Sequence, residues 1–299
     1  MTNASDTVVA IAGLGIMGSA IARNLLRAGF QVRGYDIDGA RLADLRVAGG
    51  ATTGSASEAA FGAGLLLTSL PSAAALEATV DSLCSGDHQA LVLAELSTLP
   101  IAAKLAAHDR LAQRGIALLD CPLSGTGAQA VTGDLAVYAS GDRAAYERAA
   151  PVFARFARVS HYLGACGNGS RMKFVANLLV AIHNVASAEA IVLGMKAGLD
   201  PASIVEVIAS GVGTSRVFEL RAPLMASNNY MPATMKVDIW QKDMAVIGAF
   251  ARELGVSTPT FSATKPIYDA AQKAGLGSED TAAVCEVIAR LSGLSRAAT

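Results

Sequence analysis

The sequence is poor in several residue types that mark particular classes of protein. Its 4 cysteines are scattered, with no Cys-x-x-Cys pair and no histidine at metal-ligand spacing. This argues against a disulfide scaffold or a zinc site and predicts reduced core thiols, at Cys84, Cys121, Cys166 and Cys285. Only 5% of residues are aromatic although 52% are hydrophobic, which favours closely packed helices and a buried parallel sheet. The net charge of −1 gives no basic footprint for nucleic acid or a membrane surface.

The chain also shows no targeting pattern. Residues 1–6 lack the basic and apolar regions of a signal peptide, so we expect a cytoplasmic location. The most apolar long segment, residues 174–195, contains Asn177, Asn184 and Glu189, which predicts a buried helix rather than a membrane span. A length of 299 residues predicts two domains.

A glycine-rich turn near the start has the setting of a dinucleotide-binding loop. The apolar run 8–12 predicts a strand, residues 19–28 predict a helix, and between them lies Gly13-Leu14-Gly15-Ile16-Met17-Gly18. A second predicted strand, residues 30–35, ends at Asp36. An acid there would accept hydrogen bonds from the ribose hydroxyls and repel a 2′-phosphate, which favours NAD. Arg33 and Arg41 lie close enough in the sequence to keep NADP open.

Alternating strands and helices continue to about residue 163. Predicted strands at 65–70, 90–96, 116–120, 135–139 and 159–163 are separated by helical segments, which predicts an α/β, doubly wound Rossmann domain with a parallel sheet over residues 1–163. From residue 164 onward only helices are predicted: one from about 170 to 197, a second that begins at Asp200-Pro201, and others near 214–226, 235–254, 259–274 and 279–292. We therefore expect an all-α domain over residues 164–299.

Two stretches carry further candidate chemistry. Lys173 and Asn177 are spaced four apart, so they share one face of an apolar helix. Burial there would lower the pKa of a lysine toward the range of a general acid or base. The alternatives are a surface lysine and a helix–helix hydrogen bond. The loop 120–127 offers a hydroxyl and backbone N–H groups at a strand end for a carboxylate, or is a plain turn.

Four ordered motifs together resemble the β-hydroxyacid dehydrogenase family, whose members include 3-hydroxyisobutyrate dehydrogenase, L-threonate dehydrogenase and tartronate semialdehyde reductase. They are the glycine loop with Ala22-Arg23-Asn24-Leu25, the segment Asp120-Cys121-Pro122-Leu123-Ser124-Gly125, the segment from Gly167 through Gly169 to Lys173 and Asn177, and Gln241-Lys242-Asp243-Met244.

The resemblance implies a hydride transfer between NAD(P) and a small 3-hydroxy acid. It assigns Lys173 as general acid/base and Asn177 as its positioning partner. It assigns carboxylate binding to Ser124, Gly125 and Thr126. The cofactor would be bound by the glycine loop with Asp36 and by four further residues, Leu70, Pro71, Thr98 and Lys242.

The sequence departs from the family pattern where Thr126 replaces a glycine and Met235 replaces a phenylalanine, which leaves the substrate open. The alternatives are an NADPH-dependent semialdehyde reductase and a non-catalytic dinucleotide-binding scaffold. The long apolar helix predicts a homodimer or homotetramer.

Overall fold

The computed structural model describes residues 8–296; residues 1–7, with the segment examined for a signal peptide, and 297–299 lie outside the described part. The chain divides into two compact units, Met1–Lys173 and Phe174–Thr299. The division falls inside helix α8 (Asn168–Lys196), whereas the boundary expected from the sequence comes after residue 163.

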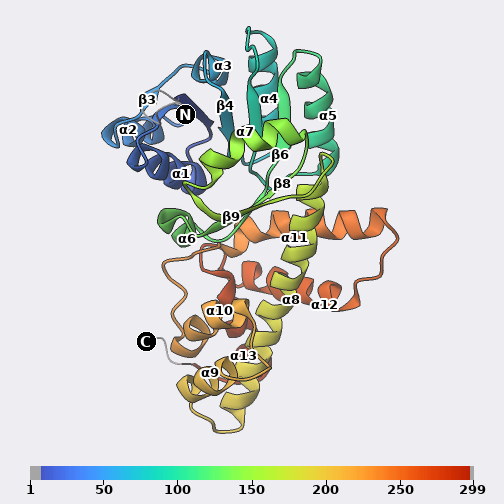
Figure 1. The fold of residues 1–299 in the computed structure, drawn as a ribbon. Coiled ribbons are helices and arrows are strands. Elements are labelled where there is room, and N and C mark those ends of the chain that lie inside the picture. Colours follow the sequence, from blue (N-terminus) through green and yellow to red (C-terminus); the bar gives the residue numbers. More distant parts are fainter. Residues whose placement is uncertain (1–7, 297–299) are drawn as a thin grey trace. The chain divides into compact units, whose positions relative to one another are not determined.

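Unit 1, coloured from blue to green in Figure 1, is built on a six-stranded sheet. All neighbouring strands of this sheet pair in parallel. The strand order is β3-β2-β1-β4-β5-β6. The strands are β1 (Val8–Ala12), β2 (Gln31–Tyr35), β3 (Ala51–Thr52), β4 (Leu65–Thr68), β5 (Val92–Glu95) and β6 (Ala117–Asp120). The order reverses between β1 and β4, which is where open α/β sheets bind their ligands.

Helices cover both faces of this sheet because successive strand residues point to opposite sides. Val9 and Ile11 pack in one buried cluster, and Ala10 and Ala12 pack in another. The helices are α1 (Ile16–Arg27), α2 (Gly39–Val47), α3 (Ala56–Ala60), α4 (Ala73–Cys84), α5 (Ile101–Ala112), α6 (Gly127–Thr132) and α7 (Arg143–Phe153). Side-chain caps begin several of them, for example Asp38 at α2 and Ser72 at α4. This is the doubly wound architecture expected from the sequence.

Two strands expected to continue the parallel sheet form a second, smaller one instead. It has the order β7-β8-β9, from β7 (Leu123–Ser124), β8 (Leu135–Ala139) and β9 (Ala157–Tyr162). The chain leaves β6 at Pro122, which has no N–H for a ladder, and β7 then pairs antiparallel to β8. One bridge, between Asp120 and Ser140, links the two sheets.

Unit 2 is helical over its described residues, apart from a bridge between Lys236 and Asp280. Its elements after α8 are α9 (Pro201–Ala209), α10 (Arg216–Ser227), α11 (Val237–Glu253), α12 (Pro259–Lys273), the short 3-10 helix η2 (Thr281–Ala283) and α13 (Val284–Leu291). Among residues 8–296, α8 alone is long and apolar enough to span a membrane by length and composition, a property that core helices of soluble proteins share. Asn184, buried in α8, donates to the Tyr268 hydroxyl and to the carbonyl of Thr281.

Candidate functional site

The glycine loop connects β1 to α1 at the carboxyl edge of the six-stranded sheet. Gly13 has a φ of 89°, and a Cβ there would lie 2.2 Å from the carbonyl oxygen of Ser69. A Cβ on Gly18 would lie 1.9 Å from the carbonyl oxygen of Gly13. Gly15 differs, because its nearest neighbour would be the Arg41 guanidinium at 3.6 Å. Gly13 and Gly18 are thus needed for the turn itself, and Gly15 leaves the loop open to a ligand at the amino end of α1.

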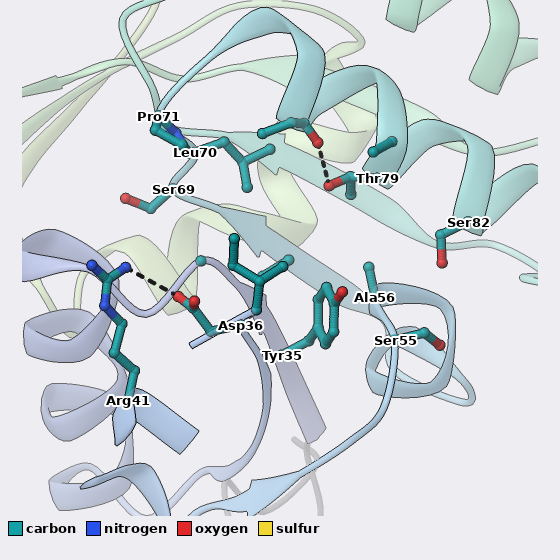
Figure 2. Close-up of a pocket in the computed structure, with 15 residues that line it drawn as sticks. Tyr35, Asp36, Arg41, Ser55, Ala56, Ser69, Leu70, Pro71, Thr79 and Ser82 are labelled. Atoms are coloured by element: carbon teal, nitrogen blue, oxygen red, sulfur yellow. Dashed lines mark hydrogen bonds and ion pairs between the residues drawn. The ribbon is translucent and has the colours of Figure 1, made fainter. Parts of the chain in front are cut away.

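A cavity beside this loop is lined by residues of β1, β2, α2, α3 and α4 and of the turns that follow β1, β2 and β4 (Figure 2). Gly13, Asp36, Leu70 and Pro71, which the sequence assigned to the cofactor, all line it. Its far wall consists of small and hydroxyl-bearing side chains, Ser55, Ala56, Ala75, Ala78, Thr79 and Ser82. The cavity has a volume of about 750 Å³ including its open mouth.

Asp36 is fixed at the mouth of the cavity by backbone donors. Its Oδ2 accepts from the N–H of Leu14 at 2.6 Å, and its Oδ1 accepts from the N–H of Asp38 at 2.9 Å. The Arg41 guanidinium lies 3.4 Å from Oδ2, as the dashed line in Figure 2 shows. The carboxylate therefore joins the glycine loop to the end of β2. Its oxygens keep lone pairs for further donors.

The β4–α4 turn is held in place by Ser97, whose Oγ accepts from the N–H of Leu70 at 2.7 Å. Thr98, next in the chain, is half-buried and is not among the residues that line the cavity beside Asp36.

The candidate carboxylate loop lies next to the glycine loop. A Cβ on Gly127 would lie 2.7 Å from the side chain of Ile16, at the first residue of α1. Asn24 of α1 also donates to the carbonyl of Ala130 in α6 at 2.7 Å. The turn between β7 and α6, which carries Ser124 and Gly125, is thereby fixed against the amino end of α1.

Thr126 is used locally. Its hydroxyl accepts from the N–H of Gln129, and the Gln129 Oε1 accepts from the N–H of Thr126 at 3.0 Å, which forms a capping box for α6. A substrate carboxylate at the Thr126 N–H would therefore have to displace or share the Gln129 oxygen. Ser124 is half-buried at the start of this turn.

Buried charges anchor the beginning of α8. Lys104 Nζ lies 2.6 Å from Glu95 Oε2 and 2.7 Å from Asp120 Oδ1, and none of the three side chains is exposed. Burial would lower the pKa of Lys104, but the two carboxylates outweigh it and raise the pKa above its usual value. Asp120 also accepts from the N–H and the hydroxyl of Ser170, at 2.7 and 2.8 Å.

Lys173 and Asn177 follow on α8, one turn apart, and both side chains are buried. The Asn177 amide donates to Asp243 Oδ2 on α11 at 2.9 Å. Lys242, the residue before Asp243, is exposed.

The described residues contain no group of three or more potential metal ligands.

Three residues of this region had been given no role from the sequence: Glu95, Lys104 and Asp243. Glu95 lies in an otherwise apolar buried strand, and Asp120 ends the next one. Two acids on adjacent buried strands require a cation, which is a signal that could have directed attention to Lys104. Asp243 was visible as part of the late Lys-Asp pair, but its contact with Asn177 depends on how α8 and α11 pack.

The sequence predicted that the four cysteines are reduced core thiols, and two of them lie in the core. All four are free; Cys121 and Cys285 are buried, and Cys84 and Cys166 are half-buried. Burial raises the pKa of Cys166 and of Cys285 to about 11.

Family models match most of the chain. Residues 8–164 match the NAD binding domain of 6-phosphogluconate dehydrogenase, and residues 167–288 match the NAD-binding domain of NADP-dependent 3-hydroxyisobutyrate dehydrogenase.

Individual relatives agree with the models. An L-threonate dehydrogenase of Cupriavidus necator is 34% identical over 93% of this chain and 95% of its own length. The glyoxylate/succinic semialdehyde reductase 2 of Arabidopsis thaliana is 31% identical over 92% of this chain and 78% of its own length. The crystal structure of a 3-hydroxyisobutyrate dehydrogenase from Salmonella typhimurium has a TM-score of 0.84 and 30% identity, and covers 94% of this chain and 100% of its own. With its glycine loop, doubly wound sheet and helical second unit, the chain belongs to the β-hydroxyacid dehydrogenase family and is an NAD(P)-dependent oxidoreductase of small hydroxy acids.

Proposed function

We propose that the protein transfers a hydride between NAD(P) and a small 3-hydroxy acid, with Lys173 as the general acid/base. The observation that carries this proposal is the pair of buried polar side chains one turn apart on α8, Lys173 and Asn177. A primary amine and an amide on one face of an apolar helix can together bind a hydroxyl and exchange its proton.

The proton and the hydride leave the substrate for different acceptors. On oxidation, the Lys173 amine takes the hydroxyl proton while the C–H electron pair departs as hydride, and the carbon becomes a carbonyl. A bound nicotinamide cofactor would supply the acceptor for that hydride. On reduction the Lys173 ammonium returns the proton to the carbonyl oxygen. Asn177, oriented by Asp243, positions the substrate oxygen and the lysine.

Ser124, Gly125 and Thr126 are proposed to bind the substrate carboxylate. The turn that carries them lies against the first residue of α1, beside the dinucleotide loop. Because the Thr126 N–H already donates to Gln129, the Ser124 hydroxyl and the Gly125 N–H are the donors that a carboxylate reaches without an exchange of partners.

NAD is the proposed preferred cofactor, with NADP as a possible second. Asp36 keeps acceptor capacity for ribose hydroxyls, and its charge repels a 2′-phosphate. Arg41, half-exposed at 3.4 Å from Asp36, supplies a positive charge that makes NADP tolerable. Thr98 and Lys242 remain proposed cofactor contacts on the strength of the family motifs.

The substrate class and direction have two candidates. Similarity to the L-threonate dehydrogenase of Cupriavidus necator supports the first candidate, oxidation of a sugar acid or of a 3-hydroxyisobutyrate-like acid. Similarity to the glyoxylate/succinic semialdehyde reductase of Arabidopsis thaliana supports the second candidate, reduction of a small semialdehyde.

The experiment that tests the proposal combines a substrate panel with a lysine exchange. Purified protein is assayed by NADH and NADPH absorbance with 3-hydroxyisobutyrate, L-threonate, glycerate and succinic semialdehyde. We expect Lys173→Ala to lower kcat by about 10²–10⁴-fold, the usual contribution of a general acid/base, with NADH affinity unchanged. Lys196→Ala, an exposed lysine in the last turn of the same helix, is the matched control and should keep full activity. Undiminished turnover by Lys173→Ala would contradict the assigned role, and a strong NADPH preference would contradict the role of Asp36.

A homodimer or homotetramer in the cytoplasm is the proposed state of the protein. Several apolar side chains of unit 2 are exposed, among them Val175, Leu193, Leu199 and Val207. Apolar side chains of this kind favour association between copies of the chain.

A further inference from the structure

Three ionisable side chains are buried together in unit 1, and none of them lines the cofactor cavity. Glu95 ends β5, Asp120 ends β6, and Lys104 lies in α5 between them. Lys104 Nζ also donates to the carbonyl oxygen of Ser97 at 2.7 Å. The cluster holds two negative charges and one positive charge, with none of its side chains exposed.

Such a cluster is a poor source of stability. Removing ions from water costs several kcal/mol for each ion, and apolar side chains of similar volume often stabilise a fold equally well or better. The contacts that the cluster makes with other elements are therefore the place to look for its role.

One member of the cluster binds the first turn of α8. Asp120 Oδ2 accepts from the N–H of Ser170 at 2.7 Å, and Oδ1 accepts from the Ser170 hydroxyl at 2.8 Å. Ser140, whose hydroxyl lies 3.2 Å from the Asp120 carbonyl oxygen, accepts from the N–H of Gly169 at 2.9 Å. N–H groups at a helix start ordinarily have no partner within the helix. Here the N–H groups of Gly169 and Ser170 are bound to side chains of the strand ends in unit 1, which we also call the Rossmann unit.

Lys173 follows Ser170 by three residues, so it lies nearly one turn further along the same helical face. The carboxylate at the amino end of α8 interacts favourably with the helix dipole, and Lys104 holds that carboxylate in one orientation. The rotation and height of the first turn of α8 are thus set by Asp120. The same turn therefore determines the position from which the Lys173 side chain extends.

We propose that Asp120 is a positioning residue for Lys173, with Lys104 as its buried counter-ion, and that Glu95 balances the charge of Lys104 without contacting α8. This inference rests on the proposed function, because it takes Lys173 as the general acid/base. Asp120, at the start of the candidate carboxylate loop, thus sets the position of the helix that carries the proton-transfer group.

Asp120→Asn and Glu95→Gln form a matched pair for the test. Each removes one carboxylate charge from the same buried cluster, but only Asp120 contacts α8; Glu95 contacts Lys104 and the N–H of Ser97. We expect Asp120→Asn to lower kcat by about 10–100-fold, the effect of misplacing a catalytic group by about an ångström, with NADH affinity within about twofold of the parent. Glu95→Gln should lower the urea midpoint comparably and keep kcat within about threefold.

Ser140→Ala keeps the test decisive if Asp120→Asn does not fold. It removes the acceptor for the Gly169 N–H without touching Lys104, and we expect a fall in kcat without loss of NADH binding. Parental kcat in folded Asp120→Asn would overturn the inference, as would parental kcat in Ser140→Ala if Asp120→Asn does not fold. An equal loss of kcat in Glu95→Gln would overturn it too.

A double substitution separates this inference from the proposed function. In the Lys173→Ala background, Asp120→Asn should lower the residual rate by less than about threefold, because effects of residues that act as a unit are not additive. If the two losses multiply, Asp120 does not act through Lys173 and the inference fails. If Lys173→Ala alone leaves kcat unchanged, the proposed function fails first.

Discussion

At the scale of single residues, the three glycines of the dinucleotide loop have separable roles. Gly13 and Gly18 allow the backbone to approach itself, since a Cβ at either position would lie within 2.2 Å of a carbonyl oxygen. At Gly15 a Cβ would make only an ordinary contact, with the Arg41 guanidinium at 3.6 Å, and its φ of −65° and ψ of −165° are values that any L-residue adopts. Gly13 and Gly18 therefore serve folding, and Gly15 serves the approach of a ligand.

This separation predicts opposite outcomes for two alanine substitutions. Gly18→Ala should lower the free energy of unfolding by about 1–3 kcal/mol, the usual cost of overpacking, as measured by urea denaturation. Gly15→Ala should change it by less than about 1 kcal/mol but weaken NADH binding, followed by fluorescence titration, by about tenfold or more. Parental NADH affinity in Gly15→Ala would show that the pyrophosphate does not approach the loop at this position.

Residues that act through their own loop were predictable from the sequence. The glycine loop and Asp36 are local features, because the turn and the acid lie within one β-α-β segment, and the structure brings Gly13 and Asp36 to one cavity. Lys104 was not predicted: the two buried acids indicate that a cation is needed, but a lysine in a mostly apolar helix is ordinarily exposed, so the sequence does not show which cation pairs with them. Its partners come from two strands, and only the packed sheet brings them within 2.7 Å.

At the scale of elements, the start of α8 is packed tightly against the Rossmann unit. A Cβ on Gly169 would lie 2.2 Å from the Tyr138 carbonyl oxygen and 2.6 Å from that of Asp120. Both are backbone atoms of strand ends, which cannot turn aside as a flexible side chain can. The close approach is possible only because residue 169 has no side chain.

Gly169→Ala should therefore displace the first turn of α8. We expect a loss of about 1–3 kcal/mol in the free energy of unfolding. Because Lys173 moves with that turn, kcat should fall by about tenfold or more. Gly39→Ala is the control: it is also at a helix start, and its Cβ would have no neighbour within 4 Å, so both quantities should stay near the parental values. Parental kcat in Gly169→Ala would contradict the link between this packing and Lys173.

Most elements could be predicted from the sequence, but their pairing could not. Hydrophobic runs located β1, β4, β5 and β6, and the helices of unit 2 were expected within a few residues of their observed ends. The strands β8 and β9 were expected too, but not their separate sheet. An apolar run indicates a strand and does not indicate which edge it pairs with. The two-residue strands β3 and β7 are too short for a period-2 pattern to show.

At the scale of the whole molecule, unit 2 carries its own buried acid. Asp280 accepts from the Thr234 N–H at 2.8 Å and hydroxyl at 2.6 Å, from the Ala282 N–H at 3.0 Å, and from Arg221 Nε at 3.3 Å. Burial would raise the pKa of Asp280, but Arg221 and the hydrogen bonds outweigh it and leave the pKa below its usual value. The ionised form thus contributes to stability above the unfolded pKa.

This contribution should be lost in acid. The free energy of unfolding should decrease as the pH falls from about 4 through the lower folded pKa, because the unfolded state then binds the proton first. Asp280→Asn should cost about 3–5 kcal/mol at pH 7, since it leaves Arg221 buried without its charge partner. The difference between parent and variant should narrow below about pH 4 in urea titrations.

Asp269→Asn is the control for the Asp280 titration. Asp269 pairs with Lys265 on the exposed face of α12, and such surface pairs contribute about 0–1 kcal/mol. Its effect should be small at every pH. A gap between parent and Asp280→Asn that stays constant down to pH 3 would show that the proton binds elsewhere.

Temperature should act unequally on the features that hold the site together. The cost of keeping charged groups away from water falls as a protein is heated, whereas stabilisation by apolar burial levels off. The buried cluster of Glu95, Lys104 and Asp120 therefore becomes a relatively stronger attachment at higher temperature than the apolar packing around it. The amino end of α8 should then remain attached to the Rossmann unit until its sheet melts, so that Lys173 keeps its place on heating for as long as that unit remains folded.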